Sequence, residues 1–127
     1  MKRYIIDIKN YWRVIVYFDI DYGSFDLISE DLAHYFCPKE EINSIWNHIN
    51  TDAKAFTFSN INLKISIVGF NKHKNKYDYI NSIVHECEHI KQSMLKAYYI
   101  NDSGEPPAYT IGYLVSKMLL LNNKLCY

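Results

Sequence analysis

One long segment, residues 79–100, constrains the fold of this chain more than any other part of the sequence. It contains no proline or glycine, and its apolar residues recur at the three- and four-residue spacing of one helix face. The residues on that predicted face are Ile80, Ile83, Val84, Cys87, Ile90 and Met94. Asp78 precedes the segment as a predicted helix cap, and residues 101–104 follow it with a turn signal. We therefore expect one long helix that packs on the rest of the chain.

The middle of this helix carries the pattern His-Glu-x-x-His at His85, Glu86 and His89. Residues four apart lie one turn from each other on the same helix face, so both imidazoles can reach a single ion. Glu86 follows the first histidine and can serve as the carboxylate base that zinc hydrolysis needs. The pattern predicts a zinc (Zn2+) site with His85 and His89 as ligands, to which the chain must add a third ligand.

The best candidate for the third ligand is Glu105, at the start of the next predicted helix. That helix opens at Pro106 and Pro107 and runs to about residue 122. Ala108 and Gly112 lie three and seven residues after Glu105 on the same predicted face, and their small side chains would let two helices approach closely. A ligand shared between two helices requires such an approach.

Alternatives stay open around this helix start. Tyr109 shares the face of Glu105, and its hydroxyl is a candidate donor to an oxyanion, but the residue pattern favours an ordinary packed aromatic at this position. Each proline disfavours helical conformation at the residue before it, so a second possibility is a helix that begins at Pro107, with Glu105 extended at its mouth. Asp102 and Glu88 are the alternative third ligands. Glu88 could also be a solvated charge or a partner that orients a histidine.

The first half of the chain predicts a hairpin followed by a helix. Residues 4–8 and 12–20 are rich in β-branched and aromatic residues, and a turn signal separates them. Residues 38–50 have apolar residues at helical spacing after Pro38 and predict a helix. Residues 25–36 between them are ambiguous, with a short helical turn expected at 30–36.

A second strand pair is predicted at residues 55–59 and 63–70, directly before the long helix. We expect residues 63–70 to form an exposed sheet edge beside His85 and His89. Together the elements predict an α+β fold in which a small antiparallel or mixed sheet of about four strands packs on the long helix and a C-terminal helix.

Length and composition fit one domain over residues 1–127, because 127 residues with 49% hydrophobic content support a single core. The formal net charge of zero argues against a nucleic-acid binder held by phosphate attraction.

The three cysteines, Cys37, Cys87 and Cys126, are odd in number and far apart, which favours a reducing compartment over a disulfide framework. No apolar run reaches the length of a signal peptide or a membrane span, so we expect a cytoplasmic protein without a membrane segment.

The two motifs of the C-terminal third, His85-Glu86-x-x-His89 and Glu105-x-x-Ala108-Tyr109 with Gly112 a little further on, resemble small zincin-like proteins of bacteria, phages and mobile elements. The layout is similar to that of gluzincins. The resemblance implies a minimal zincin-like fold in which His85, His89 and Glu105 are the metal ligands and Glu86 is the general base. It also implies that an extended substrate pairs with a strand edge over the active-site helix.

Two classes of function follow from these features. The first is a zinc-dependent metallopeptidase that hydrolyses a peptide or protein substrate through a Glu86-activated, zinc-bound water, in the cytoplasm of a bacterial or phage-infected cell. The second is a non-catalytic structural or protein-interaction component on the same fold, for example in a phage particle or mobile element, with a protein partner or assembly. Whether loss of metal unfolds the protein or only stops an activity discriminates between them.

Overall fold

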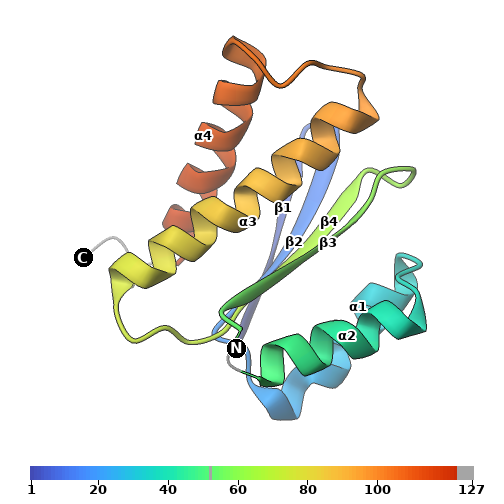
Figure 1. The fold of residues 1–127 in the computed structure, drawn as a ribbon, viewed down its shortest axis with the longest axis vertical. Coiled ribbons are helices and arrows are strands. Elements are labelled where there is room, and N and C mark those ends of the chain that lie inside the picture. Colours follow the sequence, from blue (N-terminus) through green and yellow to red (C-terminus); the bar gives the residue numbers. More distant parts are fainter. Residues whose placement is uncertain (52, 123–127) are drawn as a thin grey trace.

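The computed structural model describes residues 1–51 and 53–122 and shows an α+β fold built on one mixed sheet (Figure 1). The strand order is β1-β2-β4-β3. The strands are β1 (Lys2–Ile8), β2 (Trp12–Phe18), β3 (Ala55–Asn60) and β4 (Ile65–Phe70). The helices are α1 (Phe25–His34), α2 (Lys39–Asn50), α3 (Lys76–Ala97) and α4 (Glu105–Leu121), with a short 3-10 turn at Tyr22–Ser24. The predicted α+β class is confirmed.

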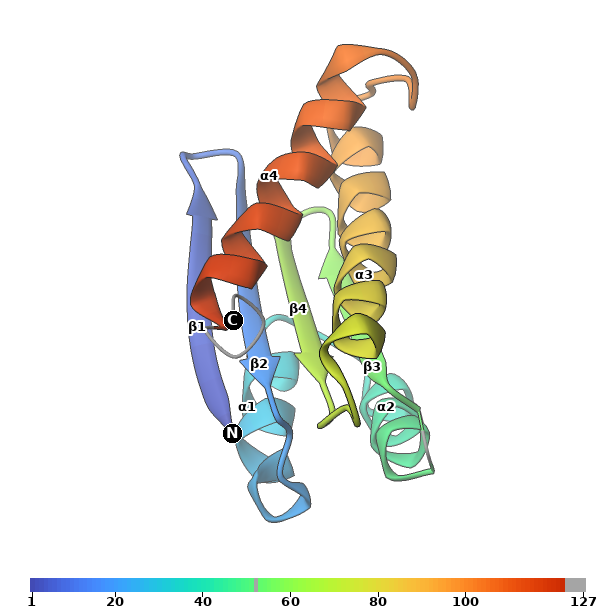
Figure 2. The same cartoon turned by 90° about the vertical axis from the view of Figure 1, so that its left-hand side faces the viewer.

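Helices α3 and α4 cover one face of the sheet, and α1 and α2 cover the other (Figures 1 and 2). An apolar cluster lies under each pair of helices. Successive side chains of a strand point to opposite faces, so Val14 and Val16 of β2 pack under α3 and α4, while Ile15 and Tyr17 pack toward α1 and α2. All four side chains have no measurable exposure. A strand segment covered on both faces is apolar on both, which explains the unbroken apolar run of residues 14–18 in β2.

Both predicted strand pairs are confirmed as antiparallel neighbours, β1 with β2 and β3 with β4. The two pairs join through a parallel contact between β2 and β4. The expectation that residues 63–70 form the sheet edge is wrong, because β4 pairs with β2 on one side and with β3 on the other. The exposed edge next to α3 is β3, and it runs from Ala55 to Asn60.

The first two helices differ in how well the sequence predicted them. Helix α2 matches the predicted segment 38–50 to within one residue. Helix α1 is longer than the predicted turn, and it buries Phe25, Ile28 and Leu32 at three- and four-residue spacing against the sheet. Its burial, more than its own sequence preference, accounts for the ten residues that it holds in helical form.

Helix α3 begins three residues earlier than predicted. The side chain of Asn75 accepts a hydrogen bond from the backbone N–H of Asp78 at 2.9 Å, so Asn75 is the cap and the prediction of Asp78 in that role is wrong. Ile83, Cys87 and Ile90 lie fully buried on the predicted apolar face. Val84 was predicted on that face but is 40% exposed, because it lies beside the stripe and not on it.

Helix α4 begins at Glu105, after Gly104 in a left-handed conformation at φ 80°. The alternative in which Glu105 is extended is therefore wrong. Leu114 and Met118 bury this helix against α3, where the thiol of Cys87 lies 3.5 Å from the sulfur of Met118.

Within residues 1–51 and 53–122, no helix combines the length and apolar character needed to cross a membrane. Cys126 lies outside the described residues.

Candidate metal centre

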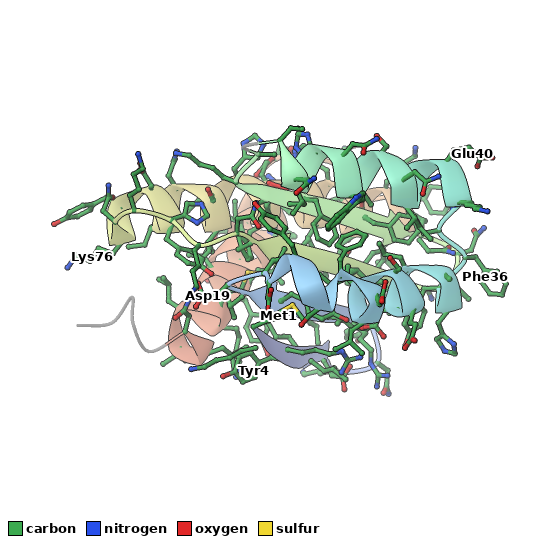
Figure 3. All side chains as sticks on the ribbon, turned by 90° about the horizontal axis from the view of Figure 1, so that it is seen from below. Met1, Tyr4, Asp19, Phe36, Glu40 and Lys76 are labelled. Carbon is green, nitrogen blue, oxygen red and sulfur yellow. The ribbon has the colours of Figure 1, made fainter. Side chains whose placement is uncertain are left out.

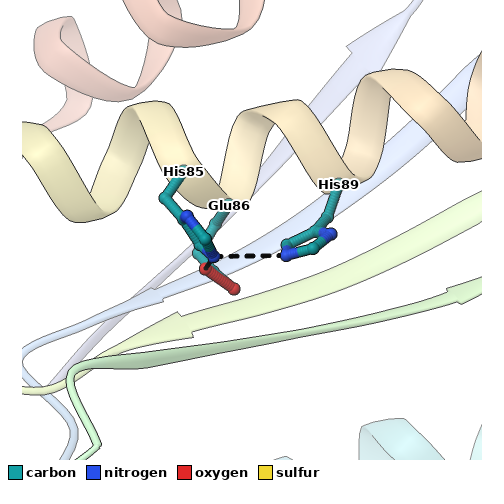
Figure 4. A group of neighbouring side chains, drawn as sticks. All are labelled: His85, Glu86 and His89. Atoms are coloured by element: carbon teal, nitrogen blue, oxygen red, sulfur yellow. Dashed lines mark hydrogen bonds and ion pairs between the residues drawn. The ribbon is translucent and has the colours of Figure 1, made fainter.

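Three potential ligand side chains converge on one side of α3, at the middle of the helix (Figure 4). Each of His85, Glu86 and His89 offers a ligand atom, and these atoms all lie within 4.8 Å of one another. The two histidines are exposed and Glu86 is buried. Their convergence follows from the helix itself, since residues four apart lie above each other and the intervening Glu86 turns toward the sheet.

The spacing of the two imidazoles fits a tetrahedral ion. The Nε2 atoms of His85 and His89 are 3.3 Å apart. Two nitrogens bound to one tetrahedral zinc at bond lengths of about 2.1 Å are separated by about 3.4 Å. The pair therefore needs little rearrangement to hold zinc, and imidazole nitrogens are among the ligands that zinc prefers.

A hydrogen bond from the sheet positions Glu86. The hydroxyl of Thr57 on β3 donates to Oε1 of Glu86 at 3.0 Å. The other carboxylate oxygen, Oε2, lies 3.9 Å from Nε2 of His85. The residue as a whole is 6% exposed, so the carboxylate is fixed beside the histidines and largely shielded from water. Nothing in the sequence around Thr57 indicated this contact, which depends on β3 lying against α3.

The three side chains line a cleft of about 850 Å³ between α2, β3 and α3. Cavities of roughly 300–1,000 Å³ are typical of ligand sites. The α2 wall presents Glu41, Ser44 and His48, which lie three and four residues apart on one helix face. No role was predicted for His48, because only the fold brings α2 to the cleft.

The backbone of β3 also faces this cleft. The N–H of Asn71 donates to the C=O of Lys54, which makes them a hydrogen-bonded pair at the end of the β3–β4 ladder. Such pairs alternate along an antiparallel ladder, so the N–H and C=O groups of Ala55, Thr57 and Ser59 point away from β4. Among the described residues no backbone group bonds to them. The cleft thus contains a free strand edge.

The structure does not bring the other predicted site residues into this group. Glu105 is the first residue of α4 and is exposed, and Tyr109 is 74% exposed. The cluster of ligand atoms found within the described chain comprises His85, Glu86 and His89 alone. Asp102 accepts a hydrogen bond from Gln92, which lies one turn beyond His89, so the loop before Glu105 passes close to the end of the cleft.

Asp102 and Glu88, the alternative third ligands, are both paired with Lys91. The ammonium group of Lys91 is 2.9 Å from Glu88 and 3.0 Å from Asp102. Hydrogen bonds from Lys91, with a smaller contribution from Gln92, lower the pKa of both carboxyl groups below their ordinary values.

Burial raises the pKa of the Cys87 thiol to about 12, so this cysteine is protonated and packs as a core residue.

No protein-family model, curated protein or solved structure matches this chain. What the chain does must therefore be inferred from its own residues. The His85–Glu86–His89 group and the free edge of β3 share one cleft.

Proposed function

We propose that this protein is a zinc-dependent metallopeptidase that cleaves peptide bonds in the cleft between α2 and α3. The observation that carries the proposal is the position of His85, Glu86 and His89 directly beside a free strand edge. A metal site of this kind supplies hydrolytic chemistry, and a strand edge supplies a place for an extended chain. The resemblance to zincin-like proteins of bacteria and phages supports a cytoplasmic location in a bacterial or phage-infected cell.

Each residue has a distinct part in the proposed reaction. His85 and His89 would hold zinc, which when bound acidifies water and polarises a substrate carbonyl. Glu86 accepts the proton of the attacking water and passes it to the leaving amine. Thr57 holds one oxygen of Glu86, so the other stays available on the side of His85. Tyr109 is proposed on the resemblance alone as a donor to the oxyanion.

The substrate is proposed to pair with β3. The outward N–H and C=O groups of Ala55, Thr57 and Ser59 repeat at every second residue, which is the spacing that an added strand requires. The middle one, Thr57, also contacts Glu86. A chain paired with β3 therefore passes the carboxylate at the centre of the cleft.

We propose Glu105 as the third zinc ligand. Catalytic zinc sites use three protein ligands, and His85 and His89 supply two. If Glu105 is the third, Glu105→Gln should lose most of its zinc while its helical circular dichroism stays unchanged. Full retention of zinc by this variant would remove Glu105 from the ligand set, and Asp102 would be the next residue to test.

The catalytic proposal is tested by Glu86→Gln. This change keeps the shape of the side chain and removes its ability to accept a proton, so we expect wild-type zinc content and a loss of peptide hydrolysis of at least about a hundredfold, as for a general base. Casein and a fluorogenic peptide mixture are suitable substrates. Hydrolysis that persists in a zinc-loaded Glu86→Gln protein would contradict the mechanism.

A non-catalytic role in protein assembly is the second candidate. The favouring observation is the outer face of α4, where Tyr109 is 74% and Leu120 65% exposed. Gly112 lies between them with nothing within 4 Å of where its Cβ would be, so no contact within the described chain requires a glycine there. An assembly protein of this kind, for example in a virion, would show concentration-dependent association that Leu120→Ser weakens and that zinc does not affect.

A further inference from the structure

The cleft has two walls on opposite faces of the sheet. Helix α3 lies on one face and α2 on the other, and both extend to the edge formed by β3 (Figures 1 and 2). A peptide that pairs with β3 as proposed above would therefore continue the sheet between the two helices. Its side chains would face α3 and α2 in turn, because successive residues of a strand point to opposite faces.

The register of such a peptide follows from β3. The side chain of Thr57 points to Glu86 on α3, whereas Phe56 and Phe58 point into the cluster under α1 and α2. Residues directly opposite each other in an antiparallel pair share a face. The peptide residue opposite Thr57 would thus face the metal centre, and its two neighbours would face α2.

Two hydrogen bonds fix which part of α2 each neighbour meets. The amide of Asn60, at the end of β3, donates to the C=O of Tyr35 just before α2. The amide of Asn71 donates to the C=O of Ile49 at the end of α2. Because Asn71 pairs with the start of β3, the helix runs opposite to the strand. The peptide residue opposite Phe58 therefore lies toward Glu41 and the residue opposite Phe56 toward His48.

The charge of the α2 wall is carried by Glu41. Among the described residues its carboxylate forms no ion pair, and the other polar residues that α2 contributes to the cleft are Ser44 and His48. The basic side chain that lines the cleft, Lys54, is 3.7 Å from Asp78 and belongs to the opposite end. An unpaired carboxylate in a cleft favours a cationic side chain from a bound partner.

We propose that the cleft takes extended peptides that carry a lysine or arginine facing α2, and that Glu41 selects this side chain. In an antiparallel peptide the selected residue precedes the one at the metal centre. The inference rests on the proposed binding of a peptide at β3. It does not depend on hydrolysis.

The test measures binding in the Glu86→Gln protein, so that the peptide stays intact. The probes are three fluorescein-labelled peptides of alternating threonine and alanine that differ at one inner alanine, replaced by lysine, methionine or glutamate. We expect the lysine peptide to bind about two- to fivefold more tightly than the methionine peptide, as for a partly exposed ion pair, and the glutamate peptide to bind weakest. The preference should shrink in 1 M salt.

Two charge reversals on α2 locate the effect. Glu41→Lys should reverse the order of the lysine and glutamate peptides. Glu40→Lys should leave the order unchanged, because Glu40 is exposed at the start of α2 and does not line the cleft (Figure 3). Equal effects of the two variants would show that the overall charge of α2 sets the preference, which would overturn the assignment to Glu41. Equal affinity of all three peptides would also overturn it.

The outcomes separate this inference from the proposed function. Lysine-selective binding that Glu41→Lys reverses supports the inference, even if zinc-loaded wild-type protein cleaves nothing and the peptidase proposal fails. Hydrolysis of all three peptides at the same rate, with no difference in binding, supports a peptidase and overturns the selectivity.

Discussion

Thr57 shows what a single residue contributes to the site and why sequence alone does not reveal it. The two histidines and Glu86 were predictable because their spacing is a property of one helix. The contact of Thr57 with Glu86 depends on the packing of a strand against that helix, 29 residues away in the chain. No local pattern encodes such a contact. For the same reason Glu41 and His48 were not predicted as residues of the cleft.

We predict that Thr57→Val lowers peptide hydrolysis by about tenfold at unchanged zinc content. The isosteric change removes the hydroxyl that positions Glu86, and a hydrogen bond to a charged group contributes about 1.5–3 kcal/mol. Steady-state kinetics and metal analysis on the same preparation check the prediction. Thr57→Ser should restore the activity, and a valine variant with full activity would show that the contact is incidental.

The pairing of Lys91 with Glu88 and Asp102 makes stability depend on pH. Both carboxyl groups have a lowered pKa, so they stabilise the fold above their unfolded pKa values near 4, and this contribution is lost as the pH falls through the lower folded values. We expect the free energy of unfolding to decrease between about pH 5 and pH 3. Lys91→Met should show a smaller decrease.

Urea titrations at pH 7 and pH 3 measure this difference. Lys96→Met is the control, because Lys96 is exposed on the same helix and pairs with no carboxylate in the described part of the chain. Equal pH dependence of the wild-type protein and Lys91→Met would contradict the assigned role of the pairing.

Strand β3 is the element on which the proposed substrate binding depends. The sequence predicted a strand at residues 55–59, but the exposed edge was predicted at residues 63–70. Whether a strand is central or at an edge depends on its neighbours, and the parallel pairing of β2 with β4 joins segments about fifty residues apart. Helix α1 was underestimated for a related reason, since its length depends on burial against the sheet.

We predict that N-methylation of a bound peptide weakens binding only at alternate residues. A residue opposite Thr57 exchanges two hydrogen bonds with the edge, while the N–H groups of its neighbours point away from β3. Methylation of the residue opposite Thr57 should weaken binding about two- to tenfold, as for the loss of one hydrogen bond. Methylation of a neighbouring residue should change the affinity little. Anisotropy titrations with the Glu86→Gln protein give both values.

Equal losses at the two neighbouring positions would contradict strand pairing. They would indicate that the peptide contacts the cleft through its side chains alone. The unmethylated peptide serves as the reference for both titrations.

The molecule as a whole does not need the metal centre for its core. The two apolar clusters lie on either face of the sheet, and His85, Glu86 and His89 belong to neither. A ligand that binds the native state alone adds stability by mass action, which amounts to about 2.7 kcal/mol at one hundred times its dissociation constant. Zinc should therefore raise the melting temperature of a protein that is already folded.

We predict that chelation with EDTA lowers the melting temperature by several degrees and leaves the far-ultraviolet circular dichroism at 25 °C unchanged. Restored zinc should restore the melting temperature in the wild-type protein and not in His85→Ala. Unfolding of the wild-type protein on chelation would favour a structural metal and the non-catalytic alternative.

The central claim is that His85 and His89 hold zinc, and metal analysis of the purified protein tests it most directly. We predict about one zinc per chain in the wild-type protein, as for a single tetrahedral site, and almost none in His85→Ala. His34→Ala is the matched control and should keep its zinc, because His34 lies on α1 and does not line the cleft. A folded wild-type protein that contains no zinc and takes up none when zinc is added would contradict the account.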